Sequence, residues 1–192
     1  MAGNALRRGG RAVLPSGGLL VWSVADGRRG RRWREVTSVD GTVVRVVLLE
    51  SAPAGRLVRL EIATAAGLLT LHPDRDGTAL HGNVVTPTGV RHLTFDRLTG
   101  LVDGSPAAAA VVVAGLADRL QVDGTSRVDL VRVDDRLEPR AESWTVTRTE
   151  PGTWRLVDSA PDGGGGVIPD RIVRLDADGL PSLDGHAWPL EI

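Results

Sequence analysis

The feature that most constrains the fold is the stretch from Leu57 to Phe95, in which four short runs of alternating apolar and polar residues are separated by turn residues. Successive side chains of a strand point to opposite faces, so such runs indicate strands with one apolar face and one polar face. Short connections between strands join antiparallel neighbours. The stretch therefore predicts a four-stranded β-meander.

Loop length extends this prediction from faces to pairs of residues. If Ala65 and Ala66 form a two-residue loop, position 62 lies opposite 69 and position 60 opposite 71. A turn over 74–77 pairs 71 with 80, and a turn over 86–89 pairs 82 with 93 and 80 with 95. One face of the meander is then apolar across all four strands, and its members are Val58, Leu60, Ile62, Leu69, Leu71, Leu80, Val84, Leu93 and Phe95.

The opposite face of the meander collects polar side chains, namely Thr70, His72, His81, Asn83, His92 and Thr94. On the predicted register His81 lies diagonal to both His72 and His92, at about 7 to 8 Å between backbone positions. A three-histidine metal site, and with it a metal-dependent hydrolase, is one hypothesis for this face. A solvated polar face is the alternative, and no Asp or Glu lies on the patch to orient an imidazole. We assign no metal, cofactor or catalytic residue from this pattern.

Composition excludes several kinds of chemistry. The 192 residues contain no Cys, and every basic residue other than His is Arg, so thiolate and lysine chemistry are both closed. The formal net charge of −1 indicates neither nucleic acid nor an anionic membrane surface as a partner. No apolar run approaches the roughly 20 residues that cross a bilayer, and no signal-peptide core occurs. We predict a cytoplasmic protein without membrane insertion.

Outside the meander the pattern predicts a tail, further strands and one helix. Residues 1–18 are expected to form a disordered tail, and residues 19–192 a single domain. Ser105 and Pro106 suit an N-cap and a first helical turn, so a helix is expected from Pro106 to about Leu120. A strand over 110–114 is the alternative, because three consecutive valines favour β structure. The other expected strands cover 19–24, 33–39, 42–50, 127–133, 143–149, 153–157 and 171–175.

The first half of the expected helix is apolar nearly all round, so it has to be buried against a sheet. The meander offers a continuous apolar face that also has to be covered. We therefore predict an α+β, mostly β domain. Its curled antiparallel sheet, of about nine to eleven strands, wraps around or packs against one buried helix.

Two groups of side chains suit a ligand. Five arginines occur between positions 28 and 34, and the planar guanidinium suits phosphate or carboxylate groups. An exposed hairpin loop is the alternative. Trp22 and Trp33 offer apolar area with one polar atom each, although Trp is also a common core residue.

The first functional hypothesis is a non-enzymatic binding module for an amphipathic small molecule, held between the sheet and the helix. The tryptophans would line its apolar part and the arginine cluster would hold its charged end. A structural or partner-docking protein is a further hypothesis. The candidate ligand-binding residues are Trp22, Trp33, Arg29, Arg31, Arg34, His81, Asn83 and His92.

The order of features resembles a glycolipid-binding family of bacterial proteins. The meander, the apolar segment and further strands are followed by Asp176-Ala177-Asp178-Gly179-Leu180 and by a closing Trp188-Pro189-Leu190. The resemblance covers roughly Gly41 to the C-terminus. It implies a spiral β-roll, in which a long curled sheet wraps around a helix, and a glycolipid-like ligand. Members carry an Asn-containing, Pro- and Arg-rich middle segment where this chain has GSPAAAAVVV, so the resemblance supports the fold more than the ligand.

Overall fold

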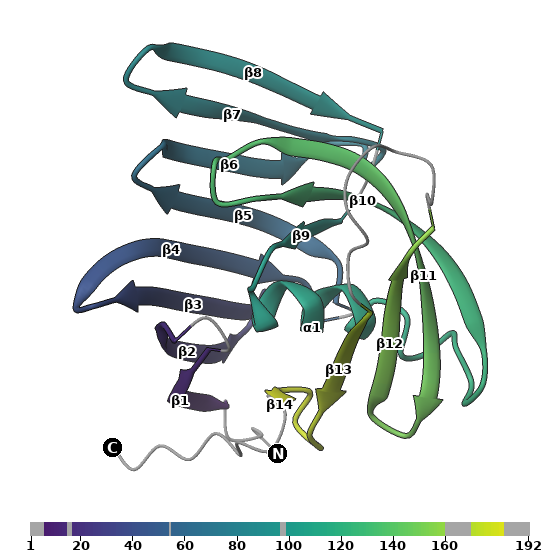
Figure 1. Ribbon diagram of the computed structural model, residues 1–192. Helices are drawn as coiled ribbons and strands as arrows, with labels where there is room; N and C mark the ends of the chain where they lie inside the picture. The colour runs from purple at the N-terminus through teal and green to yellow at the C-terminus, as the bar shows by residue number, and fades with distance from the viewer. Residues whose placement is uncertain (1–5, 15–16, 54, 97–98, 160–169, 183–192) are drawn as a thin grey trace.

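The computed structural model describes residues 6–14, 17–53, 55–96, 99–159 and 170–182, which form two sheets with one helix between them (Figure 1). The first sheet has eight antiparallel strands in the order of the sequence. They are β1 (Arg7–Val13), β2 (Leu19–Gly27), β3 (Gly30–Val39), β4 (Thr42–Ser51), β5 (Leu57–Thr64), β6 (Gly67–Pro73), β7 (Leu80–Thr86) and β8 (Gly89–Phe95).

The second sheet has six strands in the order β14-β13-β12-β11-β10-β9. They are β9 (Gly100–Val102), β10 (Thr125–Val133), β11 (Pro139–Glu150), β12 (Thr153–Asp158), β13 (Arg171–Leu175) and β14 (Pro181–Ser182). Neighbouring strands are antiparallel except β9 and β10, which pair in parallel. Parallel neighbours need a crossover, and α1 (Pro106–Ala114) supplies it.

Helix α1 is buried from Ala107 to Val113 because both of its sides face a sheet. Ala108 and Val111 pack in the core that lines the eight-stranded sheet, together with Trp33. Val112 packs in a second core that lines the six-stranded sheet. An α+β, mostly β fold with a curled sheet around one buried helix is confirmed. A strand over 110–114, the alternative, was wrong.

The register of the meander tests the loop-length prediction. Ile62 pairs with Leu69, and Leu80 pairs with Phe95, as predicted. Leu71 pairs with Gly82 instead of position 80. The β6–β7 loop is longer than expected because the carboxylate of Asp74 accepts hydrogen bonds from the backbone N–H groups of residues 78 and 79, at 2.8 and 3.4 Å. The error of two residues leaves every side chain on its predicted face.

Val58 was wrongly placed on the apolar face. The pairing of β4 with β5 shifts between Glu50 and Ser51, so that Glu50 lies opposite Arg59 and Ser51 opposite Leu57. This irregularity takes Val58 out of the alternation, and its side chain is 41% exposed. Leu57 occupies the buried position instead.

The disordered tail expected over 1–18 is corrected over its described part, because residues 7–13 form β1 and pair with β2. Gly10 lies opposite Trp22, and a Cβ atom at Gly10 would stand 2.1 Å from the indole nitrogen. The glycine at position 10 therefore leaves room for a buried tryptophan. Residues 1–5 and 15–16 of the expected tail lie outside the described residues.

Two further predictions, the number of strands and the length of the helix, were wrong. The described residues contain fourteen strands, because β1 is glycine-rich and β9 and β14 are too short to show a period. The helix ends at Ala114, with Gly115 as its C-cap, instead of continuing to Leu120. Over the described part of the chain, no helix is long and apolar enough to cross a membrane.

Candidate ligand-binding site

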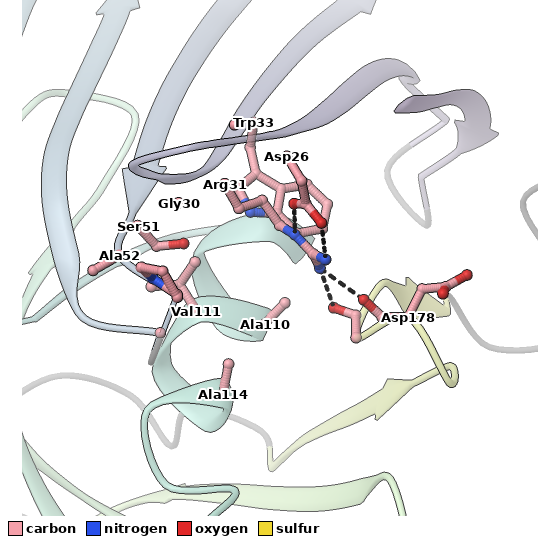
Figure 2. A pocket seen from close by; sticks show the side chains of 14 residues that line it. Asp26, Gly30, Arg31, Trp33, Ser51, Ala52, Ala110, Val111, Ala114 and Asp178 are labelled. Carbon is pink, nitrogen blue, oxygen red and sulfur yellow. Dashed lines mark hydrogen bonds and ion pairs between the residues drawn. The ribbon is translucent and has the colours of Figure 1, made fainter. Parts of the chain in front are cut away.

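An open cavity of about 390 Å³ lies between α1 and the end of the eight-stranded sheet where β2 meets β3 (Figure 2). The helix contributes Ala110, Val111 and Ala114 to one wall. The β2–β3 hairpin contributes Asp26, Gly27, Gly30, Arg31 and Trp33, and the end of β4 with the following turn contributes Ser51, Ala52, Pro53 and Gly55. Asp178 and Gly179, from the turn between β13 and β14, complete the rim.

The cavity exists because small residues meet where larger ones would fill it. Gly30 has a φ of +126°, and a Cβ atom there would stand 1.9 Å from the carbonyl oxygen of Ser51. Gly55 has a φ of +74°, and a Cβ atom there would stand 2.5 Å from the backbone nitrogen of Gly115. The turn after β4 thus rests directly on the C-terminal end of α1, and the alanines of the helix leave the space beside it open.

Arg31 closes the polar side of the cavity and is fully engaged within the protein. Its Nε donates to Asp26 Oδ1 at 2.7 Å, and its Nη2 donates to Asp26 Oδ2 at 3.1 Å. Its Nη1 donates to the carbonyl oxygen of Asp178 at 2.8 Å. The guanidinium carbon also lies 5.6 Å from the ring centroid of Trp33. Arg31 therefore joins the β2–β3 hairpin to the β13–β14 turn instead of offering a free cation.

The cavity wall contains two polar groups, and one of them is buried without a partner among the described residues. The indole N–H of Trp33 makes no hydrogen bond to a described residue, although the side chain is only 3% exposed. Ser51 is 5% exposed, and its hydroxyl oxygen points into the cavity (Figure 2). Buried polar groups in proteins almost always find a partner. This wall is therefore suited to a ligand that brings hydrogen-bonding oxygen atoms.

The polar side chains of the cavity lining are few. The described residues that line it include no histidine, and their one hydroxyl is that of Ser51. The two carboxylates of the lining, Asp26 and Asp178, form ion pairs with Arg31 and Arg8 respectively. An apolar wall with a few placed polar groups is typical of small-molecule sites.

Of the eight predicted ligand residues, the structure places only Arg31 and Trp33 in the cavity. Trp22 is buried in the same core but packs under Gly10. Arg29 lines a second, shallower depression of about 440 Å³ beside Arg28 and Arg32. Arg34 is exposed because it follows Trp33 by one residue and so points to the opposite face of β3.

The three polar residues predicted on the meander lie on the outer face of β7 and β8, away from the cavity. His92 Nδ1 lies 2.6 Å from Asn83 Oδ1, and His81 Nδ1 lies 3.3 Å from Thr94 Oγ1. The expectation that no carboxylate accompanies them was wrong, since Asp74 Oδ2 lies 4.0 Å from His81 Nε2. His72 lies directly opposite His81 instead of diagonal to it. Among the described residues, no group of three or more such side chains is arranged to hold a metal ion.

Glu35 was not among the predicted site residues, yet it positions the helix that forms the cavity wall. It is 3% exposed, and its Oε1 accepts a hydrogen bond from the backbone N–H of Ala107 at 2.8 Å. Burial raises the pKa of Glu35, while hydrogen bonds from Ser105 and Ala107 and the charge of Arg45 oppose that rise. The alternation of side chains along β3 could have identified Glu35 as buried, because it lies on the same face of the strand as Trp33.

Three further arginines hold the segment that leads into α1. Arg45, which is 6% exposed, donates from Nη1 to the carbonyl oxygen of Asp103 and from Nη2 to that of Gly104. Arg132 and Arg171 each bind the carboxylate of Asp103, at 2.7 and 2.6 Å. Burial raises the pKa of Asp103, but the bonds and charges of these two arginines outweigh it and hold the pKa below its ordinary value.

The structure is a two-sheet, single-helix α+β fold, mostly β, with an open cavity between one sheet and the helix. The structure is similar to the crystal structure of a DUF1089 family protein from Pseudomonas aeruginosa, with a TM-score of 0.57 and 15% sequence identity. The match covers 99% of this chain and 94% of that protein, and it shows a shared fold. No protein-family model matches the sequence, and no curated protein matches it. The comparison thus supports the expected fold in a bacterial protein, and it does not show the expected glycolipid-binding family.

Proposed function

We propose that this protein is a binding module for a small amphipathic molecule, lipid-like or glycolipid-like, held in the cavity between the curled sheet and α1. The observation that carries the proposal is the combination of an apolar wall with two polar groups: the indole N–H of Trp33, which is buried without a partner among the described residues, and the hydroxyl of Ser51, which points into the cavity. The cavity volume of about 390 Å³ lies within the range typical of small-ligand sites.

The apolar part of the ligand would lie against the helix. Val111 and the methyl groups of Ala110 and Ala114 offer it a surface without polar atoms, and Trp33 lines the same cavity. Burying apolar area contributes about 25 cal/mol per Å², so a short alkyl chain gains most of its affinity here.

The polar part of the ligand would be an uncharged, oxygen-bearing group. An indole N–H only donates, so it requires an acceptor oxygen, and the hydroxyl of Ser51 either donates or accepts. Of the arginine cluster only Arg31 lines the cavity, and its donors are occupied by Asp26 and Asp178. Arg29 and Arg34 were expected to form a charged end of this site. We propose a neutral polar end in their place.

The first experiment is extraction of the purified protein with organic solvent, followed by mass spectrometry of what co-purifies. The second is calorimetric titration with octyl glucoside and with octyl phosphate, each below its micellar concentration. We expect octyl glucoside to bind more tightly than octyl phosphate, because the cavity offers no free cation. Absence of any co-purified molecule together with absence of octyl glucoside binding would overturn the proposal.

A cavity-filling variant locates the binding. Ala114→Leu places a larger side chain in the cavity wall and should reduce octyl glucoside affinity by at least tenfold, which is about 1.4 kcal/mol. Ala141→Leu makes the same change at an exposed position of β11 and is the matched control. Equal affinity in both variants would place the binding elsewhere on the protein.

A further inference from the structure

The outer face of β1–β4 has an unusual combination of side chains. Alternation along each strand sends every second residue away from the core, and no element of the described chain packs on that side. We call these residues the basic-aliphatic face. Its arginines are Arg7, Arg11, Arg32 and Arg34, its one carboxylate is Glu50, and its aliphatic residues are Val13, Leu19, Val21, Ala25, Val36, Val44, Val46 and Leu48.

Most of the positive charge on this face is free. Arg32 forms an ion pair with Glu50, with Nη2 and Oε1 2.6 Å apart. Arg7, Arg11 and Arg34 are exposed and form no ion pair with a described residue. The face therefore carries a local net positive charge, even though the whole chain has a formal charge of −1. The overall charge balance of the sequence conceals this separation.

The aliphatic residues form a continuous band between these arginines. Val21 pairs with Val36, and Val36 pairs with Val46, so three neighbouring strands carry valine at the same level of the sheet. Arg11 extends this row on β1, where it lies opposite Val21. Val21 is 46% exposed and Leu19 is 40% exposed, whereas Val36 and Val46 in the middle of the face are partly buried. Contiguous exposed apolar surface in a protein commonly marks an interaction site.

We propose that the basic-aliphatic face docks on an anionic lipid surface. Guanidinium groups bind phosphate oxygens, and aliphatic side chains at the same level enter the boundary between head groups and acyl chains. A single-stranded nucleic acid would be recognised through aromatic stacking as well as charge, and no described residue of this face is aromatic. The combination of free cations and aliphatic side chains matches a lipid surface on both counts.

The β2–β3 hairpin extends the positive charge beyond the face itself. Arg28 and Arg29 occupy its exposed turn and line the second depression together with Arg32 and Val58. The candidate cavity lies on the inner side of the same hairpin and shares Asp26 and Arg31 with this depression. Docking would thus bring the hairpin that bounds the cavity close to the lipid surface. The docking proposal does not depend on which molecule the cavity binds.

The test is co-sedimentation of the full chain with vesicles of phosphatidylcholine mixed with phosphatidylglycerol, against vesicles of phosphatidylcholine alone. We expect binding to the mixed vesicles, weakened by added salt. The double variant Arg11→Gln/Arg34→Gln should lower the partition coefficient by about fivefold for each arginine. The matched control, Arg75→Gln/Arg136→Gln, removes the same charge at two exposed positions outside the face and should bind like the unaltered protein.

A third variant, Val21→Ser, removes apolar area without changing charge and should also weaken binding to the mixed vesicles. Several results would overturn the proposal: equal binding to neutral and anionic vesicles, equal losses in the two double variants, or tighter binding to a DNA duplex than to vesicles. Sedimentation velocity showing a dimer that Val21→Ser dissociates would also overturn it, because the face would then be an interface between two copies. Ala114→Leu should leave vesicle binding unchanged, so the cavity and docking proposals fail separately.

Discussion

The carboxylate of Glu35 accepts a hydrogen bond of 2.5 Å from the hydroxyl of Ser105, a residue 70 positions later in the chain. The same hydroxyl accepts a hydrogen bond from the backbone N–H of Ala108 at 3.1 Å, as an N-cap does. A buried carboxylate from the sheet thus completes the cap of α1. Because negative charge is favourable at a helix N-terminus, this contact fixes both the position and the direction of the helix.

The first prediction concerns the pH dependence of stability. Because burial raises the pKa of Glu35 above 4.5, the folded protein retains a proton that the unfolded chain releases. The stability that this group contributes is therefore fully present below about pH 4.5 and is lost as the pH rises through the raised pKa. Glu35→Gln removes the titration, so its free energy of unfolding should change less between about pH 4.5 and 8.

Urea unfolding at several pH values measures this difference between the two proteins. Asp103 has a lowered pKa, so its contribution is lost as the pH falls below about 3.8, outside the window in question. Parallel pH profiles for the unaltered protein and Glu35→Gln would contradict the prediction.

The second prediction compares two glycines that share a backbone conformation. Gly41 and Gly55 have φ values of +76° and +74°, but a Cβ atom at Gly41 would meet nothing within 4 Å. Gly41→Ala should therefore lower the free energy of unfolding by about 1 kcal/mol, from backbone strain alone. Gly55→Ala should cost at least about 3 kcal/mol, because the new methyl group collides with the backbone at the end of α1. Urea unfolding of both variants tests this, and equal losses would refute it.

The third prediction concerns the pair of Arg31 and Asp26. Their side chains are 22% and 37% exposed, so solvent screens a pair whose geometry is otherwise favourable. A double-mutant cycle with Arg31→Gln and Asp26→Asn should give a coupling energy of about 1 kcal/mol or less. A coupling above about 2 kcal/mol would show that the pair is effectively buried when the protein is in solution. Chemical unfolding of the four proteins supplies the measurement.

Local alternation was sufficient to predict most of the eight-stranded sheet. Two-residue loops fix register, so the pairs of Ile62 with Leu69 and of Leu80 with Phe95 followed from the sequence. The register across the loop after Pro73 did not follow from the sequence, because the length of this loop is set by the side chain of Asp74. β1 was not predicted, because the role of Gly10 depends on its pairing with Trp22. That pairing cannot be recognised from the local sequence of β1.

The candidate site was only partly predictable for a related reason. Trp33 and Arg31 lie at the end of one strand, and their types indicated a ligand. Arg34, which is adjacent to Trp33, points to the other face of the sheet. The alternation of side chains along a strand already implied this. The approach of Asp178 and of the alanines in α1 arises from the packing of two sheets around a helix. No local pattern encodes that approach.

The strand order carries a consequence for how the chain folds. In β1–β8 every strand pairs with its neighbour in sequence, so each pairing closes a short loop and loses little entropy. The parallel pair of β9 and β10 forms only after the chain passes through α1. During synthesis the residues of the first sheet are made before those of α1, which covers its apolar side. Until α1 docks, the concave surface bearing Leu60 and Leu71 stands open to water, and that interval is when the chain is most prone to aggregate.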